Sequence, residues 1–174
     1  MSKVDAHLRV LLKQNMVPHR AFSLLLFNSR NELLLQQRSL KKITFPGMWT
    51  NTCCSHPRHT KEELVPEGFI GVKRAAIRRA NFELGIPMEA LSTDDLQVGS
   101  RILYYANGCD NFAEYELDYI IFAKKDVDHD FNVDEIKSTE YVSRTEFKTF
   151  IDEKHKQGEM ITPWFKLLSD NSLD

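Results

Sequence analysis

The stretch GFIGVKRAAIRRANFELG, residues 68–85, predicts the helix around which the rest of the fold is arranged. Apolar residues recur on one side of it, beside a strongly basic side, as in a helix that covers a core. Its apolar positions are Ile70, Ala75, Ala76, Ile77 and Ala80. Gly85 and then Pro87 stop the pattern, because Gly is favoured just after a helix and Pro cannot continue one. We therefore expect a helix from Gly68 to Leu84.

Strand patterns flank this helix on both sides. Before it, the apolar runs 21–27 and 32–38 are separated by four turn-forming residues, which predicts a hairpin. After it, residues 101–106 and 114–123 predict two more strands, joined through Asn107-Gly108. The order of strands, helix, strands and helix predicts an α+β or α/β sandwich with mixed strands.

Two helices are predicted near the C-terminus. Ser143-x-x-Glu146 is a capping box, so a helix begins there and ends at Gly158. Thr162-Pro163 begins a short helix, with Thr as cap and Pro at the first position.

The long segment 40–66 has neither a helical nor a strand periodicity of apolar residues. It contains aromatic, Cys and His residues, which favours a functional loop over a disordered one.

Length and composition exclude several classes of protein. The 174 residues predict a single domain over 1–174, large enough to bury a core without disulfides. Lys and Arg number 23 against 25 Asp and Glu, a net charge of −2, so no overall positive field attracts nucleic acid or anionic lipid. Three cysteines, two of them adjacent, disfavour a secreted disulfide framework. No apolar run reaches the ~20 residues of a membrane span. We expect a cytoplasmic, soluble protein.

Acidic residues alternate along the predicted strand 114–123. Glu114, Glu116 and Asp118 point to one face because residues two apart in a strand share a face. The face is either solvated or enclosed, and enclosed carboxylates need a cation between them. The histidines His7, His19 and His56 are its natural co-ligands, although a single histidine is more often a surface or core residue than a metal ligand. Such a set suits Mg²⁺, Mn²⁺ or Zn²⁺.

The adjacent residues Cys53 and Cys54 form a second unusual feature. Adjacent side chains project in different directions, so at most one faces a pocket while the other packs like a small hydrophobic residue. A thiol close to His56 and a metal has a shifted pKa, which is how a cysteine becomes an acid, a base or a nucleophile.

Glu83 occupies the last helical turn, where the helix dipole disfavours a carboxylate. One explanation is an ion pair with Arg79, four residues earlier. The other is that Glu83 holds a divalent ion bound to a phosphorylated ligand, with Arg38, Lys42 and Arg79 contacting the phosphate oxygens.

Taken together, seven segments in order resemble type I isopentenyl-diphosphate delta-isomerase, most closely its eukaryotic branch. They are HRAFS (19–23), LQQRS (35–39), ITFPG (43–47), TNTCCSHP (50–57), RR with ELG (78–85), ExE (114–116) and ITPWF (161–165). The resemblance covers nearly the whole chain. It implies a Nudix-like fold, in which a mixed β-sheet is sandwiched between helices.

The Nudix helix itself is degraded. A hydrolase of this fold carries R-E-U-x-E-E-x-G-U, whereas residues 78–86 read RRANFELGI and keep the first Arg, the final Glu and the Gly. Arg79 and Phe82 replace two of the three acidic residues. This loss weakens the metal cluster that hydrolases use and favours a family that does not hydrolyse its substrate.

The resemblance implies conversion of isopentenyl diphosphate to dimethylallyl diphosphate in isoprenoid biosynthesis, by protonation and deprotonation through a tertiary carbocation. The implied catalytic residues are Cys54, Glu116 and Tyr104, which assists Glu116. The implied substrate-binding residues are Lys3, Arg38, Lys42 and Arg79 for the diphosphate and Trp164 for the reacting carbons. The implied ligands of a divalent metal are His7, His19, His56, Glu114 and Glu116, and Glu83 would hold a second ion, Mg²⁺, that bridges to the diphosphate.

Rival interpretations follow from the same features. The chain looks shorter at both ends than members of the family, so a poorly active truncated homologue is one alternative. A Nudix-type pyrophosphohydrolase and a non-catalytic binding protein are the others. The expected partner is a small isoprenoid diphosphate, with no nucleic acid or membrane, and the expected state is a monomer. Delivery to the peroxisome stays open, although the chain ends in Ser172-Leu173-Asp174 rather than Ser-Lys-Leu.

Overall fold

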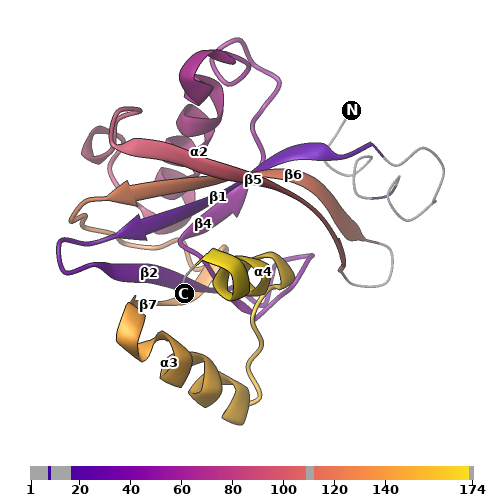
Figure 1. Ribbon diagram of the computed structural model, residues 1–174, viewed down its shortest axis with the longest axis vertical. Helices are drawn as coiled ribbons and strands as arrows, with labels where there is room; N and C mark the ends of the chain where they lie inside the picture. Colours follow the sequence, from indigo (N-terminus) through magenta and orange to yellow (C-terminus); the bar gives the residue numbers. More distant parts are fainter. Residues whose placement is uncertain (1–7, 9–16, 109–111, 173–174) are drawn as a thin grey trace.

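The computed structural model describes residue 8 and the ranges 17–108 and 112–172. A mixed β-sheet lies between helices on its two faces (Figure 1). The strands are β1 (His19–Phe27), β2 (Glu32–Arg38), β3 (Trp49–Thr50), β4 (Cys53–Ser55), β5 (Leu96–Asn107), β6 (Ala113–Lys124) and β7 (Ile136–Ser143). The helices are α2 (Ile70–Leu84), α3 (Arg144–Lys156) and α4 (Pro163–Ser172), with short 3₁₀ turns η1 (Glu67–Phe69) and η2 (Met88–Ala90).

The sheet brings segments from distant parts of the chain side by side. Its main path runs β3-β2-β1-β6-β5, while β4 pairs with β1 and β7 pairs with β2. Strands β1 and β6 are parallel, with His19 opposite Glu116, and the other pairs are antiparallel. This mixture confirms the fold class that the order of elements predicted.

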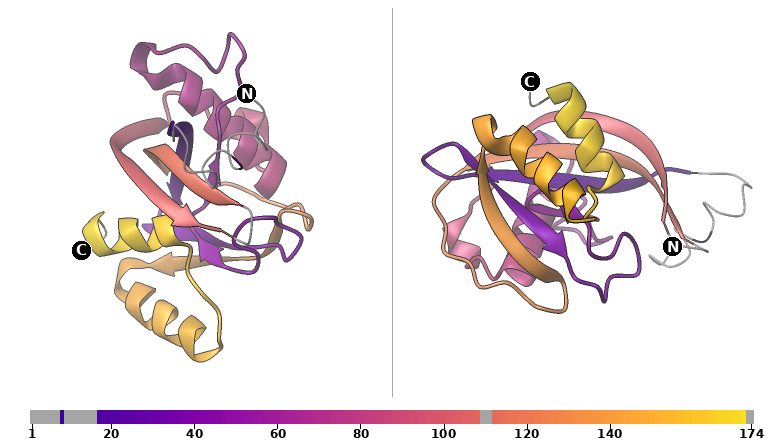
Figure 2. Two further views of the ribbon diagram at one scale, coloured as in Figure 1. Left: turned by 90° about the vertical axis from the view of Figure 1, so that its right-hand side faces the viewer. Right: turned by 90° about the horizontal axis from the view of Figure 1, so that it is seen from below.

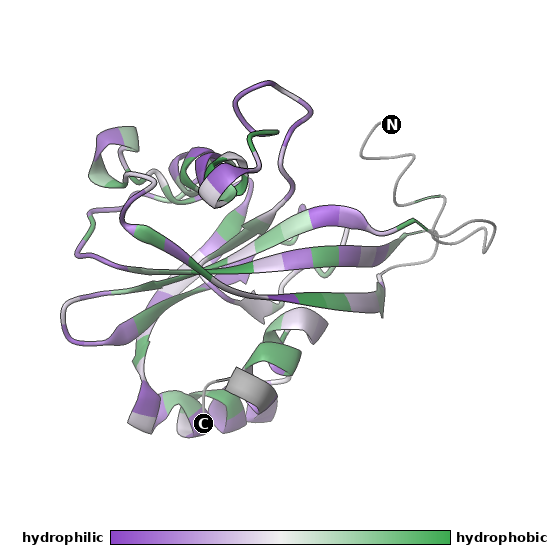
Figure 3. Cartoon of the chain, turned by 45° about the horizontal axis from the view of Figure 1, so that its top comes forward, coloured by the Kyte–Doolittle hydropathy of each residue, from purple (hydrophilic) through white to green (hydrophobic). Residues whose placement is uncertain are grey.

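Each face of the sheet has its own hydrophobic core. Helix α2 covers one face, and α3 with α4 covers the other, as the turned views of Figure 2 show. Along β1, Leu24 packs toward α2 and Leu25 toward α4. Because β1 is buried on both sides, its sequence is a continuous apolar run rather than an alternation. Elsewhere in the sheet, hydrophobic and hydrophilic residues are interleaved along the strands (Figure 3).

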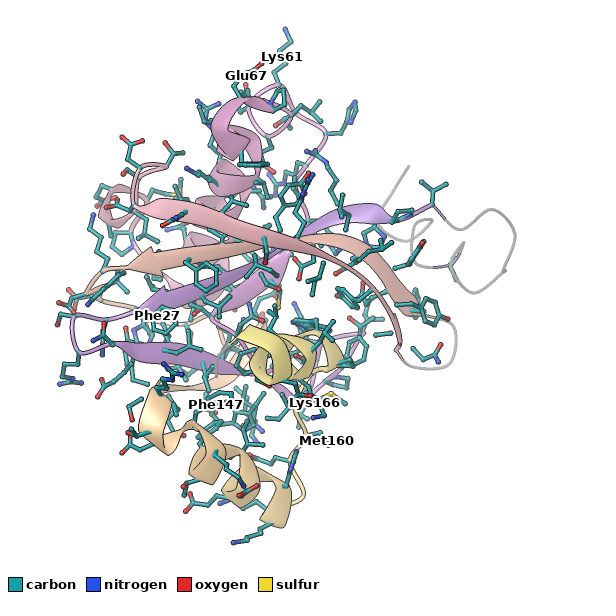
Figure 4. The ribbon with its side chains drawn as sticks, in the orientation of Figure 1. Phe27, Lys61, Glu67, Phe147, Met160 and Lys166 are labelled. Carbon is teal, nitrogen blue, oxygen red and sulfur yellow. The ribbon has the colours of Figure 1, made fainter. Side chains whose placement is uncertain are left out.

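The two helices on the second face also contact each other. Phe147 of α3 meets Phe165 of α4 edge to face, with ring centres 5.8 Å apart. In Figure 4, Phe147 and Lys166 mark this side of the sheet, whereas Lys61 and Glu67 mark the opposite side, ahead of α2. The Ser143 cap is confirmed, since its side chain accepts a hydrogen bond from the backbone N–H of Glu146.

Helix α2 begins two residues later than predicted. Gly68 and Phe69 have left-handed backbone angles, with φ of 57° and 58°, so the turn η1 precedes the helix instead of continuing it. The predicted end is confirmed at Gly85, whose φ is +67°. A Cβ on Gly85 would lie 2.2 Å from the backbone oxygen of Asp130, so both the angle and the close approach require glycine.

Three strands were not predicted. The segment 40–66, expected as a loop, contains β3 and β4, which are too short to have a periodicity. Strand β7 has few apolar residues because much of its length is only partly buried. Within the described residues, we find no helix that is long and apolar enough to cross a membrane.

Candidate functional site

A cavity of about 330 Å³ opens between the sheet, the loop after β2 and the start of α4. Nine of the residues singled out from the sequence line it: Arg38, Lys42, Cys54, His56, Arg79, Tyr104, Glu114, Glu116 and Trp164. His19 and Glu83 lie next to lining residues, Glu116 and Arg79 respectively. His7 and Lys3 lie outside the described residues.

Two histidines and two glutamates converge at one side of the cavity. The Nε2 atoms of His19 and His56 lie 3.1 and 2.6 Å from Glu116 Oε1 and 3.0 Å from each other. One donor atom from each of these residues and from Glu114 lies within 4.8 Å of the others. The parallel pairing of β1 with β6 places His19 opposite Glu116, and β4 delivers His56 just beyond its end.

This cluster fits a divalent cation. Imidazole nitrogen and carboxylate oxygen are the ligands that Mg²⁺, Mn²⁺ and Zn²⁺ share. Burial alone raises the pKa of Glu116, but His56 and the hydrogen bonds from both histidines outweigh it and hold the pKa well below its usual range. Glu116 is therefore a carboxylate in a buried site, the state in which it can ligate a metal.

The acidic alternation of β6 is enclosed, not solvated. Glu114 and Glu116 are each 6% exposed and Asp118 is 1% exposed. Asp118 accepts a hydrogen bond of 2.7 Å from Ser23 Oγ. Burial raises the pKa of Asp118 well above its usual range, so it keeps its proton. The sequence pattern placed Asp118 on this face, but it assigned the residue no role.

Tyr104 reaches the same cluster from β5. It pairs with Glu116 across the sheet, and its hydroxyl donates a hydrogen bond to Glu116 Oε2. Burial raises the pKa of Tyr104 well above its usual value, with the Glu116 charge adding to the effect. The phenol therefore stays protonated and acts as a donor to Glu116.

The adjacent cysteines face opposite sides of β4. Cys53 is fully buried in the core beneath α2, where its thiol donates to Glu83 Oε2 at 3.5 Å. Cys54 lines the cavity, with its sulfur 3.7 Å from both Thr50 Oγ1 and Asn51 Oδ1. Burial raises the pKa of Cys54 to about 12, so the thiol holds its proton.

A chain of alternating charges runs along another part of the cavity. We call Glu83, Arg79, Glu135 and Lys42 the charge chain. Arg79 donates to Glu83 Oε1 and lies 3.4 Å from Glu135, while Lys42 Nζ lies 2.5 Å from the same Glu135 oxygen. Burial raises the pKa of Glu83, but the Arg79 and Lys42 charges bring it below its usual value. Glu135 was not singled out from the sequence, because this residue ends the acidic stretch 126–135, which contains no recognisable motif.

Arg38 and Trp164 form the remaining wall. The Arg38 guanidinium donates to the backbone oxygens of Thr44 and Phe45 at 2.8 and 3.0 Å. Its central carbon lies 5.7 Å from the Trp164 ring centre. The Trp164 indole N–H donates to Asn51 Oδ1 at 3.1 Å, which fixes the ring plane against the cavity.

Comparison with solved structures identifies the fold. The NUDIX domain family matches residues 17–165. The crystal structure of DR0079 from Deinococcus radiodurans superposes with a TM-score of 0.60 at 15% identity, over 92% of this chain and 88% of that one. A NUDIX hydrolase from Alicyclobacillus acidocaldarius gives 0.62 at 8% identity, over 87% and 89%. Identities this low show the fold alone.

Curated relatives are much closer in sequence. Isopentenyl-diphosphate Delta-isomerase I of Clarkia breweri is 45% identical over 99% of this chain, which spans 61% of that relative. Isopentenyl-diphosphate Delta-isomerase 1 of Mesocricetus auratus is 47% identical over 99% of this chain and 75% of its own length. The corresponding isomerase I of Camptotheca acuminata is 43% identical, over 99% and 74%. The chain therefore belongs to the Nudix family and, within it, to the isopentenyl-diphosphate delta-isomerases.

Proposed function

We propose that this chain, as a single Nudix-like domain, isomerises isopentenyl diphosphate to dimethylallyl diphosphate in isoprenoid biosynthesis. One observation carries the proposal. The thiol of Cys54 and the carboxylate of Glu116 line the same cavity as the basic side chains Lys42 and Arg79. The names of the relatives support the same activity.

The reaction needs two acid/base groups. A proton is added to an unactivated alkene, which gives a tertiary carbocation, and a different proton is then removed. The pKa directions support Cys54 as the group that holds a proton and Glu116 as the group able to accept one. Tyr104 supports this assignment, since its hydroxyl orients the Glu116 carboxylate.

The cavity wall suits a cationic intermediate. The aromatic face of Trp164 would stabilise a carbocation by cation–π attraction, worth about 2 kcal/mol when desolvated. Trp164 is only 4% exposed, so it contributes a dry wall. Exclusion of water matters because water would capture the carbocation as an alcohol.

Two sites would hold divalent cations. His19, His56, Glu114 and Glu116, with His7 as the expected fifth ligand, fit Mg²⁺, Mn²⁺ or Zn²⁺. Glu83 would hold a Mg²⁺ ion that bridges to the diphosphate, and Arg38, Lys42, Arg79 and Lys3 would contact its oxygens. Bound cations would supply positive charge that stabilises the Glu116 carboxylate and the diphosphate.

The test is incubation of the protein with isopentenyl diphosphate and Mg²⁺ in D₂O. Deuterium-labelled dimethylallyl diphosphate supports the isomerase. Release of phosphate or a monophosphate would instead indicate a pyrophosphohydrolase, and unchanged substrate would indicate a binding role or a poorly active truncated homologue. The monomeric state and the cytoplasmic location stay predictions. Light scattering would test the first, and microscopy of the tagged chain would test the second.

A further inference from the structure

Glu135 lies in the cavity wall and has no part in the acid/base chemistry proposed above. It joins the two cations expected to hold the diphosphate, since one of its oxygens accepts from both Lys42 and Arg79. These cations come from the loop after β2 and from α2, whereas Glu135 directly precedes β7. Three segments distant in sequence therefore meet at one carboxylate.

The backbone holds Glu135 firmly in this position. Its carbonyl accepts from Ser39 N–H at 2.9 Å, and its N–H donates to Asn132 O at 2.9 Å. Asn132 N–H in turn donates to the carbonyl of Glu83 at 2.8 Å, so the segment is tied to the end of α2. The side chain is 19% exposed, and the cavity reaches it.

The charge chain has no net charge. Two cations, Lys42 and Arg79, face two carboxylates, Glu83 and Glu135. A diphosphate that entered alone would have to leave water and compete with Glu135 for both cations, so each new contact would replace an existing ion pair. Glu83 and Glu135 would hold a divalent cation that entered with the diphosphate, and its charge would leave Lys42 and Arg79 available to the phosphate oxygens.

We infer that Glu135 determines ligand specificity at this site: its carboxylate, shared by Lys42 and Arg79, makes the site select a metal-complexed diphosphate over a metal-free one. The inference rests on the proposed function, because it assumes that this part of the cavity receives the diphosphate. It adds a residue that acts through the two cations and not through the reacting carbons.

The experiment measures the binding of inorganic pyrophosphate to the purified chain by calorimetry, from Mg²⁺-free to saturating Mg²⁺. For the unmodified chain, affinity should rise at least about tenfold with Mg²⁺. For Glu135→Gln, affinity without Mg²⁺ should rise about tenfold and affinity at saturating Mg²⁺ should change little, so the dependence on Mg²⁺ nearly disappears.

Two variants serve as controls. Glu140→Gln removes the same charge from an exposed position on β7 that pairs with Lys154 at 3.3 Å, outside the cavity, and should behave like the unmodified chain. Glu135→Asp keeps the charge and should keep the dependence on Mg²⁺. If thermal melting shows that Glu135→Gln does not fold, Glu135→Ala takes its place as the neutral variant.

Three outcomes would overturn the inference. These are superimposable Mg²⁺ curves for Glu135→Gln and the unmodified chain, an equal loss of affinity at every Mg²⁺ level, and a Glu135→Asp curve that matches Glu135→Gln. The D₂O assay is scored separately on the unmodified chain. Mg²⁺-selective pyrophosphate binding without isomerisation would refute only the proposed function, and isomerisation without that selectivity would refute only the role of Glu135.

Discussion

Cys53 and Cys54 are chemically identical neighbours, yet they belong to two regions with different tasks. Cys53 faces α2 and belongs to a closed hydrophobic core, whereas Cys54 faces α4 and lines the cavity. The difference arises because successive side chains of a strand point to opposite faces. The α2 face of β4 therefore supports the fold, and the opposite face carries the proposed acid/base thiol.

The adjacent arginines of α2 are separated in the same way. Arg78 forms two hydrogen bonds with the buried carboxylate of Glu63 and also donates to the carbonyl of His56, which fastens the loop after β4 to the helix. Arg79 instead enters the cavity and pairs with Glu83. Neighbours on a helix lie about 100° apart around its axis, so one can fasten the fold while the other meets a ligand.

The largest expected effect comes from Cys54→Ala. Loss of the proposed acid/base group should lower the isomerisation rate by about 10³-fold or more, because no other thiol among the described residues lines the cavity. The melting temperature should change little. Rates from product analysis and thermal melts on the same preparation measure both quantities.

Cys53→Ala is the matched control, with the opposite pattern. It should keep the rate within a few-fold and lower the melting temperature, because it removes a fully buried side chain from the core beneath α2. Equal losses of activity in the two variants would break the comparison between the faces.

Metal removal should have the next largest effect. Treatment with a chelator should reduce activity by at least about a hundredfold, since the His19–His56–Glu114–Glu116 cluster fits a divalent ion. Activity should return when metal is added back, and separate additions of Mg²⁺, Mn²⁺ and Zn²⁺ would show which ion restores it. Full activity in a chain shown by elemental analysis to be metal-free would refute the metal site.

Glu63→Gln should affect stability more than the acid/base chemistry. It replaces the carboxylate that Arg78 and the Arg58 N–H bind, so unfolding should become easier by about 1–3 kcal/mol at neutral pH. Burial raises the pKa of Glu63, but the hydrogen bond from Arg78 and its other partners lower it below the usual value. The unmodified chain should therefore lose this stabilisation as pH falls below about 4.3 and through the lower pKa of the folded state.

Urea unfolding at neutral and acidic pH measures this difference. The gap between the unmodified chain and Glu63→Gln should narrow as the pH falls. Glu62→Gln, at the exposed neighbouring position, is the control and should follow the unmodified chain. Identical unfolding curves for the Glu62 and Glu63 variants would show that the Arg78 ion pair does not fasten the loop.

The smallest expected effect concerns α3, on the same face as the cavity but away from it. Ser143→Ala removes the side-chain cap from the N-terminus of α3 and should cost about 1 kcal/mol of unfolding free energy, with the isomerisation rate unchanged. Thr149→Ala, exposed in the middle of α3, should cost nothing. A fall in the rate of Ser143→Ala would extend the functional region to α3.

Elements with local signals were predictable from the sequence. The hairpin of β1 and β2, the C-terminal end of α2 and the cap of α3 each depend on residues within a few positions of one another. The alternation along β6 was equally local, and the enclosed face carries the residues that it predicted. Strand β7 and the short strands β3 and β4 lack such a signal, because their pairing partners define them.

The sequence by itself determined which residues could do chemistry and which faces of their own elements they occupy, because periodicity and capping act over a few residues. Only the tertiary structure decided what those faces meet. The parallel register of β1 and β6 brings His19 to Glu116, although 97 positions separate them. Packing of the segment before β7 against α2 likewise brings Glu135 to Arg79. Such contacts depend on how all the elements pack at once, which no local pattern records.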